Sequence, residues 1–180
     1  MNAHADFRVG HGYDAHRRAP AGDAAPDGRD LVLGGVRFAD EPPLLGHSDA
    51  DVVSHAVIDA FLSAAGLGDI GEMFPDTDPA HAGASSIELL RQCAAAVDSA
   101  GWRLLNADCT VVTDRPMLSP HKPKMQRLLS DAARGPVTVS GKRTEGLGAL
   151  GRGEGVAAFA VALVGRCPDA TGIDAEDGQR

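Results

Sequence analysis

Asp14 and His16 are the first residues of the chain whose types and spacing suggest chemistry. They lie in the segment Arg8–Arg17, with the sequence RVGHGYDAHR. Residues i and i+2 of an extended segment point to the same side, so a carboxylate oxygen and an imidazole nitrogen can converge on one point. A catalytic zinc site usually takes three protein ligands and keeps a fourth position open. The pair alone is therefore a weak indication of metal binding, and a solvated polar pair is the ordinary alternative.

A third candidate ligand, His55, lies in the segment 47–61, with the sequence HSDADVVSHAVIDAF. The apolar residues of this segment recur at helical spacing. His55 lies one helical turn from both Asp51 and Asp59, so the three side chains share a face. One interpretation is a solvated face on which the histidine bonds a carboxylate. The other makes His55 the third metal ligand, with Asp51 or Asp59 fixing its tautomer, and the spacing alone does not choose between them.

The composition describes a globular domain of ordinary size. The chain has 180 residues, of which 43% are hydrophobic and only 4% aromatic, so one domain with an aliphatic core is expected. No apolar run has the length of a membrane span, and residues 1–6 lack a signal-peptide pattern, so we expect a cytoplasmic protein without a membrane partner. Cys93, Cys109 and Cys167 have no Cys-x-x-Cys spacing and are expected to be reduced.

The formal net charge of −8 disfavours general nucleic-acid binding. It does not exclude a phosphorylated small molecule, because a bound metal can supply the local positive charge. The charge therefore favours a small ligand over a nucleic acid as the partner of the candidate metal site.

Helices are expected to carry part of the site. Ser48 or Asp49 is a candidate N-cap for a helix that ends near Gly66. A capping box at residues 85–88 predicts the start of a second helix, which Gly101 ends. Apolar residues at helical spacing mark a third helix, and they are Met125, Leu128, Leu129 and Ala132.

Strands alternate with these helices. No Gly-x-Gly-x-x-Gly turn follows the first strand, and the Gly-rich segment 151–155 precedes a strand, so a dinucleotide-binding fold is not expected. A two-layer α+β domain over residues 7–165 fits better, with disordered segments at 1–6 and 166–180. We expect strands at residues 7–13, at 31–33 and 36–38 around a Gly34-Gly35 hairpin, and at 104–113, 137–140 and 156–164. Loops are expected at residues 19–30, 68–84 and 116–123.

Several motifs occur together in the order found in one enzyme family. They are Gly10–His16, His47–Asp51 with His55, Gly68–Gly71 with Phe74–Pro79, and Gly151–Gly155. From Phe7 to Val164 the chain resembles the 2-C-methyl-D-erythritol 2,4-cyclodiphosphate synthase family. The resemblance implies a mixed sheet with helices on one face, packed as a homotrimer around a threefold axis with active sites between subunits.

The resemblance also implies a reaction. The family converts 4-diphosphocytidyl-2-C-methyl-D-erythritol 2-phosphate to 2-C-methyl-D-erythritol 2,4-cyclodiphosphate and releases CMP, in the non-mevalonate route to isoprenoids. The 2-phosphate of the substrate attacks its β-phosphate, so no protein nucleophile is required. The resemblance assigns Asp14, His16 and His55 as zinc ligands, and Glu145 as the ligand of a second divalent cation, magnesium or manganese.

Substrate contacts follow from the same resemblance, and Asp14 and His16 are among them. His47 and Ser48 match positions that contact phosphate and erythritol. The methylerythritol contacts are Asp69, Ile70, Gly71, Phe74, Pro75, Asp76, Thr77 and Asp78, and the cytosine contacts are Thr113, Asp114, Arg115, Pro116, Met117, Leu118 and Ser119. Further contacts are Lys142, Arg143, Thr144, Glu145, Ala149 and Arg152, and the catalytic group is His47, Lys142, Arg143, Thr144 and Glu145. A central cavity near Arg152 could accept a prenyl diphosphate.

Three positions depart from the family pattern. Arg143 stands where a threonine is usual, Ala149 where an aromatic residue is common, and Ser140 where a lysine is common. Two other functions are consistent with an Asp/His/His group: a zinc-dependent hydrolase of a phosphorylated small molecule, and a non-catalytic oligomeric domain that binds metal or isoprenoid. A fused cytidylyltransferase is not expected in a chain of this length.

Overall fold

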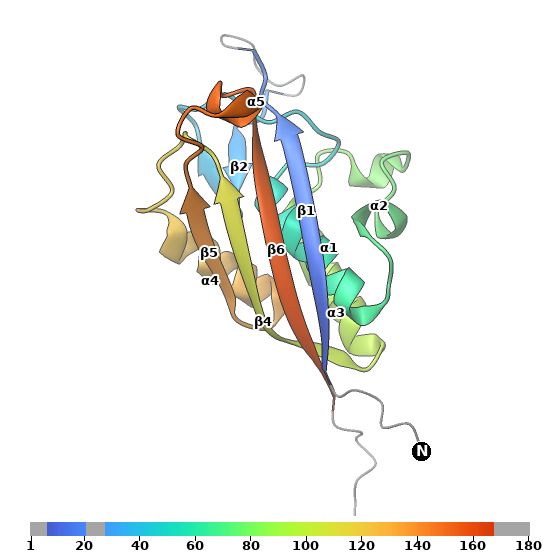
Figure 1. Ribbon diagram of the computed structural model, residues 1–180. Coiled ribbons are helices and arrows are strands. Elements are labelled where there is room, and N and C mark those ends of the chain that lie inside the picture. The colour runs from blue at the N-terminus through green and yellow to red at the C-terminus, as the bar shows by residue number, and fades with distance from the viewer. Residues whose placement is uncertain (1–6, 21–27, 168–180) are drawn as a thin grey trace, which may run out of the picture.

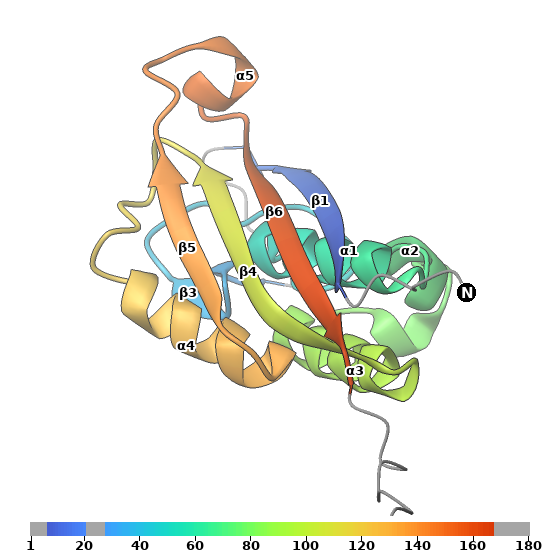
Figure 2. The same cartoon turned by 60° about the horizontal axis from the view of Figure 1, so that its bottom comes forward.

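The computed structural model describes residues 7–20 and 28–167, and its central feature is a four-stranded mixed sheet (Figure 1). The strand order is β1–β6–β4–β5, with β1 and β4 both antiparallel to β6 and β4 parallel to β5. Helices α1, α3 and α4 lie behind one face, and the other face is uncovered (Figures 1 and 2). The predicted α+β class and mixed sheet are confirmed.

The elements follow one another in a simple order along the chain. The strands of the main sheet are β1 (Phe7–Arg17), β4 (Trp102–Val112), β5 (Val137–Lys142) and β6 (Gly155–Arg166), and β2 (Leu31–Leu33) pairs with β3 (Val36–Phe38). The helices are α1 (Val52–Ala65), α2 (Ile70–Met73), the 3-10 helix η1 (Pro79–His81), α3 (Ser86–Ser99), α4 (Lys122–Ala133) and α5 (Gly148–Gly151). No helix of the described ranges is long and apolar enough to cross a membrane.

Strand β1 continues beyond its predicted end at Tyr13. Its pairing with β6 persists to the register Arg17↔Gly155, so Asp14 and His16 lie within the sheet rather than after it. Strand β6 likewise includes Arg166, which corrects the predicted start of a disordered tail at that residue. The predictions for residues 1–6, for 168–180 and for the 21–27 part of the first loop lie outside the described residues.

The Gly34-Gly35 hairpin is confirmed between β2 and β3. The two glycines have φ of 56° and 73°, the left-handed conformation that a tight hairpin turn needs and that side chains disfavour. Their N–H groups donate to Asp51 Oδ1 and Oδ2, both at 2.7 Å. The hairpin is thus fixed to the start of α1.

Helix α1 has Asp51 as its N-cap, so the predicted caps Ser48 and Asp49 are wrong. The Asp51 side chain accepts hydrogen bonds from the N–H groups of Val53 and Ser54. Sequence alone could not choose among three neighbouring cap-forming residues, because all of them favour this position. The predicted end at Gly66 is confirmed, with φ of 74°.

Helix α3 begins at Ser86 without the predicted capping box, because Ser85 makes no side-chain cap. Asp49 supplies the acceptor instead, taking the Ser86 N–H at 2.9 Å. The predicted loop 68–84 also contains α2 and η1, and Asp69 caps α2 by accepting the Glu72 N–H at 2.9 Å. A long-range hydrogen bond from Asp49 thus stabilises the start of α3, and a short-range cap by Asp69 stabilises the start of α2.

Two glycines of β1 let α1 lie directly against the sheet. A Cβ atom on Gly10 would sit 2.0 Å from the Ala60 carbonyl oxygen, and one on Gly12 would sit 2.1 Å from that of Ala56. Gly10, Gly12, Asp14 and His16 alternate along β1, so they share one face of the strand. The close approach of α1 therefore places its residues against the two candidate ligands.

The core fills the space between the sheet and the three long helices and is mostly aliphatic, as expected. Its largest fully buried side chains are Phe61, Leu31, Leu33, Leu44, Ile58, Leu62, Leu90, Met125, Leu129, Val52, Val53 and Val57. Cys93 and Cys109 are also buried in it, and no disulfide joins the three cysteines.

Candidate metal centre and substrate cavities

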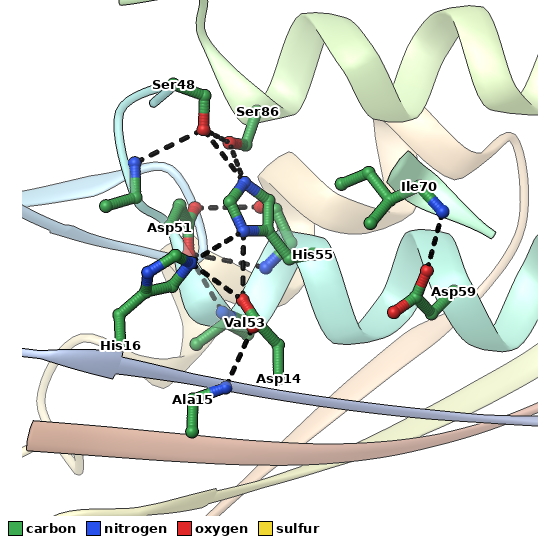
Figure 3. A network of polar contacts seen from close by, with 12 residues as sticks. Asp14, Ala15, His16, Ser48, Asp51, Val53, His55, Asp59, Ile70 and Ser86 are labelled. Carbon is green, nitrogen blue, oxygen red and sulfur yellow. Dashed lines mark hydrogen bonds and ion pairs between the residues drawn. The ribbon is translucent and has the colours of Figure 1, made fainter. Parts of the chain in front are cut away.

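Asp14, His16 and His55 converge at the N-terminal end of α1 (Figure 3). Asp14 Oδ2 lies 3.0 Å from His16 Nε2 and 2.9 Å from His55 Nδ1, and the two nitrogens are 3.1 Å apart. Ligands bound at about 2.0–2.1 Å in a tetrahedral zinc site are roughly 3.3 Å from one another. The three atoms form a triangle of nearly that size, so the group fits a small divalent cation.

Strand β1 and helix α1 together create this triangle. Asp14 and His16 are i and i+2 residues of one strand and point to the same side, as the sequence predicted. His55 reaches them from the first turn of α1, where it is 7% exposed. The absence of a side chain on Gly12 allows the backbone contact that brings the helix this close. The metal hypothesis for His55 is thus the one that the geometry favours.

Hydrogen bonds on the far side of each ring fix the nitrogens that face the triangle. His16 Nδ1 lies 2.9 Å from the Leu45 carbonyl oxygen, which can only accept, so Nδ1 carries the hydrogen and Nε2 presents a lone pair. His55 Nε2 lies 2.8 Å from Ser86 Oγ, whose own hydrogen is donated to Asp49. His55 Nε2–H therefore donates to Ser86, and Nδ1 keeps its lone pair for a metal.

Asp51 or Asp59 was predicted to orient the His55 ring, and that prediction is wrong, although the Asp14 carboxylate does lie 2.9 Å from His55 Nδ1. Asp51 binds the hairpin and caps the helix, and Asp59 accepts the Ile70 N–H at 2.8 Å (Figure 3). Ser48 Oγ, at 3.0 Å from His55 Nε2, and Ser86 take the place of these acids. Ser86 lies on α3, far from His55 in the sequence, so no local spacing indicated it.

The Asp51 carboxylate anchors the ligand helix, while the Asp51 carbonyl oxygen accepts the backbone N–H of His55 at 3.0 Å. The Asp51 side chain is fully buried and also accepts the Ser54 hydroxyl at 2.7 Å. Burial, and then the charge of Asp49, raise its pKa, whereas the Ser54 hydroxyl and the hairpin N–H groups favour the ionised form. The Asp51 side chain thus joins the β2–β3 hairpin to the start of α1.

Cation binding at the triangle is expected to compete with protonation of its side chains. Burial alone would raise the pKa of Asp14, but when the facing nitrogens of His16 and His55 carry protons, their hydrogen bonds and positive charges hold that pKa well below its usual range. Burial would lower the pKa of His16, but Asp14 outweighs it, so the pKa of His16 is raised. A cation that binds here must displace a proton, and its affinity should therefore fall as the pH falls.

A cavity of about 410 Å³ opens beside the triangle. Its wall includes the apolar side chains of Ile70, Phe74 and Leu89. His81 and Leu89 were missed by the sequence analysis, since they come from η1 and α3 and belong to no motif. The predicted residues that line the cavity are Asp14, His16, His47, Ser48, His55, Ile70, Gly71, Phe74, Pro75 and Asp76.

Three predicted members of this site stand outside that lining. Asp69 caps α2, and the Asp78 carbonyl oxygen lies 3.4 Å from His47 Nε2. Thr77 is exposed beside them. Their assigned contacts with methylerythritol stay predictions.

A second cavity, of about 270 Å³, lies at the β5 end of the sheet. Asp114 shapes it by accepting hydrogen bonds from both the N–H and the hydroxyl of Thr144. Arg115 does not line it; the Arg115 side chain is 84% exposed, and its Nε lies 3.9 Å from Glu41 Oε1. The lining includes Lys122 and Gly141, which the sequence analysis missed, with the predicted Thr113, Asp114, Pro116, Met117, Leu118, Ser119, Lys142 and Arg143.

A third cavity, of about 640 Å³, is lined by Ala149 and Arg152 together with residues 15–20 and 153–155. Arg152 Nε lies 2.6 Å from Glu154 Oε1, so its charge is paired. Glu145 lines none of these three cavities; it is exposed, with a left-handed φ of 53°. Its assigned role with a second cation stays a prediction.

Comparison with known proteins identifies the family. The sequence model of the YgbB family matches residues 7–165. A 2-C-methyl-D-erythritol 2,4-cyclodiphosphate synthase of Azoarcus sp. (strain BH72) is 52% identical over 165 residues, which cover 89% of this chain and 96% of that protein. The chain belongs to the YgbB family of 2-C-methyl-D-erythritol 2,4-cyclodiphosphate synthases. The resemblance found in the sequence is confirmed.

Solved structures of synthases share the fold. A 2-C-methyl-D-erythritol 2,4-cyclodiphosphate synthase in its CDP-bound form is 40% identical, has a TM-score of 0.75, and matches 87% of this chain and 99% of its own. A CDP complex from Plasmodium falciparum is 27% identical, has a TM-score of 0.76, and matches 92% of this chain and all of its own. The synthase fold thus extends over most of the present chain.

The three departures from the synthase pattern take no part in the hydrogen bonds of the metal triangle, although Ala149 lines the same cavity as His16. Arg143 lines the second cavity and Ala149 the third. Ser140 is half-buried in β5, paired in register with Thr110. None of them contacts Asp14, His16 or His55 in the hydrogen bonds that fix the triangle.

Proposed function

We propose that this synthase closes 4-diphosphocytidyl-2-C-methyl-D-erythritol 2-phosphate into 2-C-methyl-D-erythritol 2,4-cyclodiphosphate and releases CMP, as a lyase of non-mevalonate isoprenoid biosynthesis. The 2-phosphate oxygen forms a bond to the β-phosphorus, and the bond from that phosphorus to the oxygen bridging to the α-phosphate breaks. The observation that supports this most is the Asp14–His16–His55 triangle inside a family of known reaction.

The triangle would hold zinc, since one carboxylate and two neutral imidazoles form a usual donor set with an open fourth position. A zinc ion bound there would polarise a phosphate oxygen of the substrate. Leu45, Ser48 and Ser86 keep the rings in the required tautomer. The chain's main contribution is orientation, because the nucleophile and the leaving group belong to one substrate that must fold back on itself.

Each cavity suits one part of the substrate. The apolar wall of the 410 Å³ cavity beside the triangle, with Ile70 and Phe74, suits the methylerythritol carbon skeleton. His47 and Ser48, on its rim, are proposed to contact phosphate and hydroxyl groups. The 270 Å³ cavity at the β5 end is proposed to receive cytosine on the segment 113–119.

A second divalent cation is proposed at Glu145. Its carboxylate is exposed on the segment that follows Lys142, Arg143 and Thr144. Magnesium and manganese commonly bind through one or two carboxylates plus substrate phosphates and water. Lys142 and Arg143 line the 270 Å³ cavity proposed for cytosine, called the base cavity below, and bring positive charge to the neighbouring phosphates.

The two half-sites lie at opposite edges of the sheet, which supports an active site shared between subunits. The triangle is on β1 and the base cavity is beside β5, with β6 and β4 between them, which places the edges about 14 Å apart at ordinary strand spacing. The uncovered sheet face exposes Tyr13 (51%), Phe159 (43%) and Val161 (48%). We propose a homotrimer that buries this face and joins β1 of one subunit to the base segment of the next.

Two further assignments remain proposals of lower rank. A prenyl diphosphate in the 640 Å³ cavity would have to take Arg152 from its ion pair with Glu154 in order to bind its charge. The cytoplasmic location stays a prediction. A zinc hydrolase is not favoured, because the family match accounts for the triangle and the base cavity together.

The experiment that tests the proposal follows the phosphorus NMR spectrum of the cytidyl diphosphate substrate with protein, zinc and magnesium. We expect a cyclic diphosphate and CMP in equal amounts, and no reaction with protein stripped of metal by a chelator. A linear diphosphate or inorganic phosphate as the product would instead identify a hydrolase. Light scattering on the same sample should give three chain masses, and a monomer would contradict the shared site.

A further inference from the structure

Arg18 is a buried arginine just beyond the candidate ligands on β1. The residue is 8% exposed, although arginine is almost never buried unless it is paired. Its backbone N–H donates to the Glu154 carbonyl oxygen at 2.9 Å, and it forms an isolated bridge with Leu44. The backbone at this point is therefore fixed by neighbours on both sides, so its side chain leaves the strand from a defined position.

The Arg18 guanidinium donates hydrogen bonds to main-chain carbonyl groups and also forms a long ion pair with Glu41. Nη1 donates to the Pro42 carbonyl oxygen at 3.1 Å, and Nη2 donates to that of Arg115. The nearest carboxylate oxygen, on Glu41, is 3.8 Å away. Hydrogen bonds from a charged donor are about twice as strong as neutral ones, so this fork holds two loop segments together.

One of those segments is the proposed base-binding segment. Thr113 Oγ1 lies 3.5 Å from Arg18 Nη2 and also donates to the Arg115 carbonyl oxygen. On its other side the segment is held by Asp114, which accepts two hydrogen bonds from Thr144. Arg18 supports the segment from behind, while Thr144 holds it near the cavity.

Such support matters because part of the segment offers a ligand little besides backbone, although the Met117 side chain also lines the cavity and is 64% exposed. Thr113 is 6% exposed and Leu118 is 6% exposed, so little of their side chains reaches a ligand. Recognition of a base edge would then rely on N–H and C=O groups, whose positions depend on what holds the chain from behind. A shift of one ångström there would be felt as lost affinity.

We propose that Arg18 is a positioning residue for the cytidine half of the substrate: it fixes the Thr113–Arg115 backbone to the strand that carries the metal ligands. The inference depends on the proposed function, because it takes a cytidine nucleotide as the ligand of this segment. Arg18 itself lies behind the segment and does not contact the nucleotide. Lysine could not replace it fully, since one ammonium group cannot span both carbonyl oxygens.

The test compares Arg18→Met with wild type and with Arg37→Met, by titration calorimetry with CMP. Arg37 is a matched control because it lies on β3, is 76% exposed and pairs with Asp30, away from the base-binding segment. We expect the Kd for CMP to rise about tenfold in Arg18→Met, with one zinc still bound per chain and a larger change in KM than in kcat. Arg18→Lys should give an intermediate Kd, and Arg37→Met should leave the Kd of wild type unchanged.

The outcomes separate this inference from the proposed function. If wild type binds CMP and Arg18→Met binds it equally well, the positioning role is wrong and the function stands. If wild type does not bind CMP, the base cavity itself is wrong and the inference fails with it. A parallel loss of zinc and CMP in Arg18→Met would show a general structural role and overturn the inference. Should Arg18→Met fail to fold, the folded Arg18→Lys decides, and an unchanged Kd would overturn it.

Discussion

The β1 edge of the sheet and the β5 edge carry two different kinds of site. At the β1 edge, side chains from a strand and a helix meet within hydrogen-bond distance, and each ring has a partner behind it. At the β5 edge, a loop lines the cavity and its position depends on Arg18 and Thr144. The first site is made of side-chain chemistry on packed elements, and the second of backbone held in place by remote residues.

The two sites should differ in how well they tolerate amino-acid substitutions. A ligand triangle loses its function when one side chain is removed, because two protein ligands are fewer than a zinc site usually takes. A backbone site keeps its donors after any single substitution other than proline, and it weakens only as far as its support shifts. Variants at the β1 edge should therefore have larger effects than variants at the β5 edge.

The largest effect is expected for His55→Ala, at the centre of the β1 edge. The change leaves two ligands and an open cavity, so zinc should be lost and CMP release should fall by about 1,000-fold. Metal analysis and a CMP release assay measure both. Activity near wild type in the zinc-free variant would remove His55 from the ligand set.

Gly12→Ala tests whether close packing of α1 on β1 builds the triangle. The new methyl group would meet the Ala56 carbonyl oxygen, a backbone atom that cannot move aside, so the variant should lose about 3 kcal/mol of unfolding free energy and bind zinc less tightly. Urea denaturation and zinc titration measure these effects. Gly165→Ala, which faces only the flexible Leu105 side chain, should lose less, and equal losses would contradict the account.

Ser86→Ala removes the hydroxyl that orients His55 and should reduce zinc affinity about tenfold. The Asp49–Ser86–His55 chain would be broken, although Ser48 remains as an acceptor for Nε2–H. Competition with a chromogenic chelator measures the affinity. Ser99→Ala, on the exposed part of the same helix, is the control, and equal affinity in both variants would exclude a role for Ser86.

Glu145→Gln tests the proposed second-cation ligand, which follows β5 in the chain. Loss of the carboxylate should raise the magnesium concentration for half-maximal activity about tenfold and leave zinc bound. Glu88→Gln, an exposed residue of α3 paired with Arg91, is the control. A magnesium titration that matches wild type would remove Glu145 from its proposed role.

The smallest effect concerns two thiols inside the packed layer. Burial raises the pKa of Cys93 and of Cys109 to about 12, so both should stay protonated and unreactive at pH 8 in the folded protein, while the partly exposed Cys167 reacts. A thiol reagent followed by absorbance should count one fast group, and three after denaturation.

The same shift has a consequence for stability. Because the folded pKa lies above the ordinary thiol value of 9.0, the stabilisation that these thiols contribute is complete below pH 9 and is lost as the pH rises toward 12. Urea midpoints measured from pH 8 to pH 11 should therefore fall. Fast labelling of all three thiols at pH 8 would show that the layer opens more readily than this account allows.

The sequence predicted the β1 edge well because its chemistry is local. The i, i+2 spacing of Asp14 and His16 and the helical position of His55 follow from regular geometry that any reader of the chain can apply. The hairpin glycines and Gly66 follow from backbone rules in the same way. The metal triangle was predictable once the resemblance supplied the link between strand and helix.

What the sequence could not predict depends on contacts between distant segments. Ser86 orients His55 from another helix, Asp49 caps that helix in place of Ser85, and Asp51 displaced two neighbours as N-cap. The support of Arg115 by Arg18 likewise joins residues far apart in the chain. Each residue type has several ordinary partners, and only the fold selects one of them.

Anomalous diffraction at the zinc absorption edge would show whether Asp14, His16 and His55 bind one zinc ion. For zinc-loaded crystals, the account predicts a peak about 2.0–2.1 Å from Asp14 Oδ2, His16 Nε2 and His55 Nδ1, with the fourth position open to a substrate oxygen. A map with no peak between these atoms, or with its zinc bound to other residues, would contradict it.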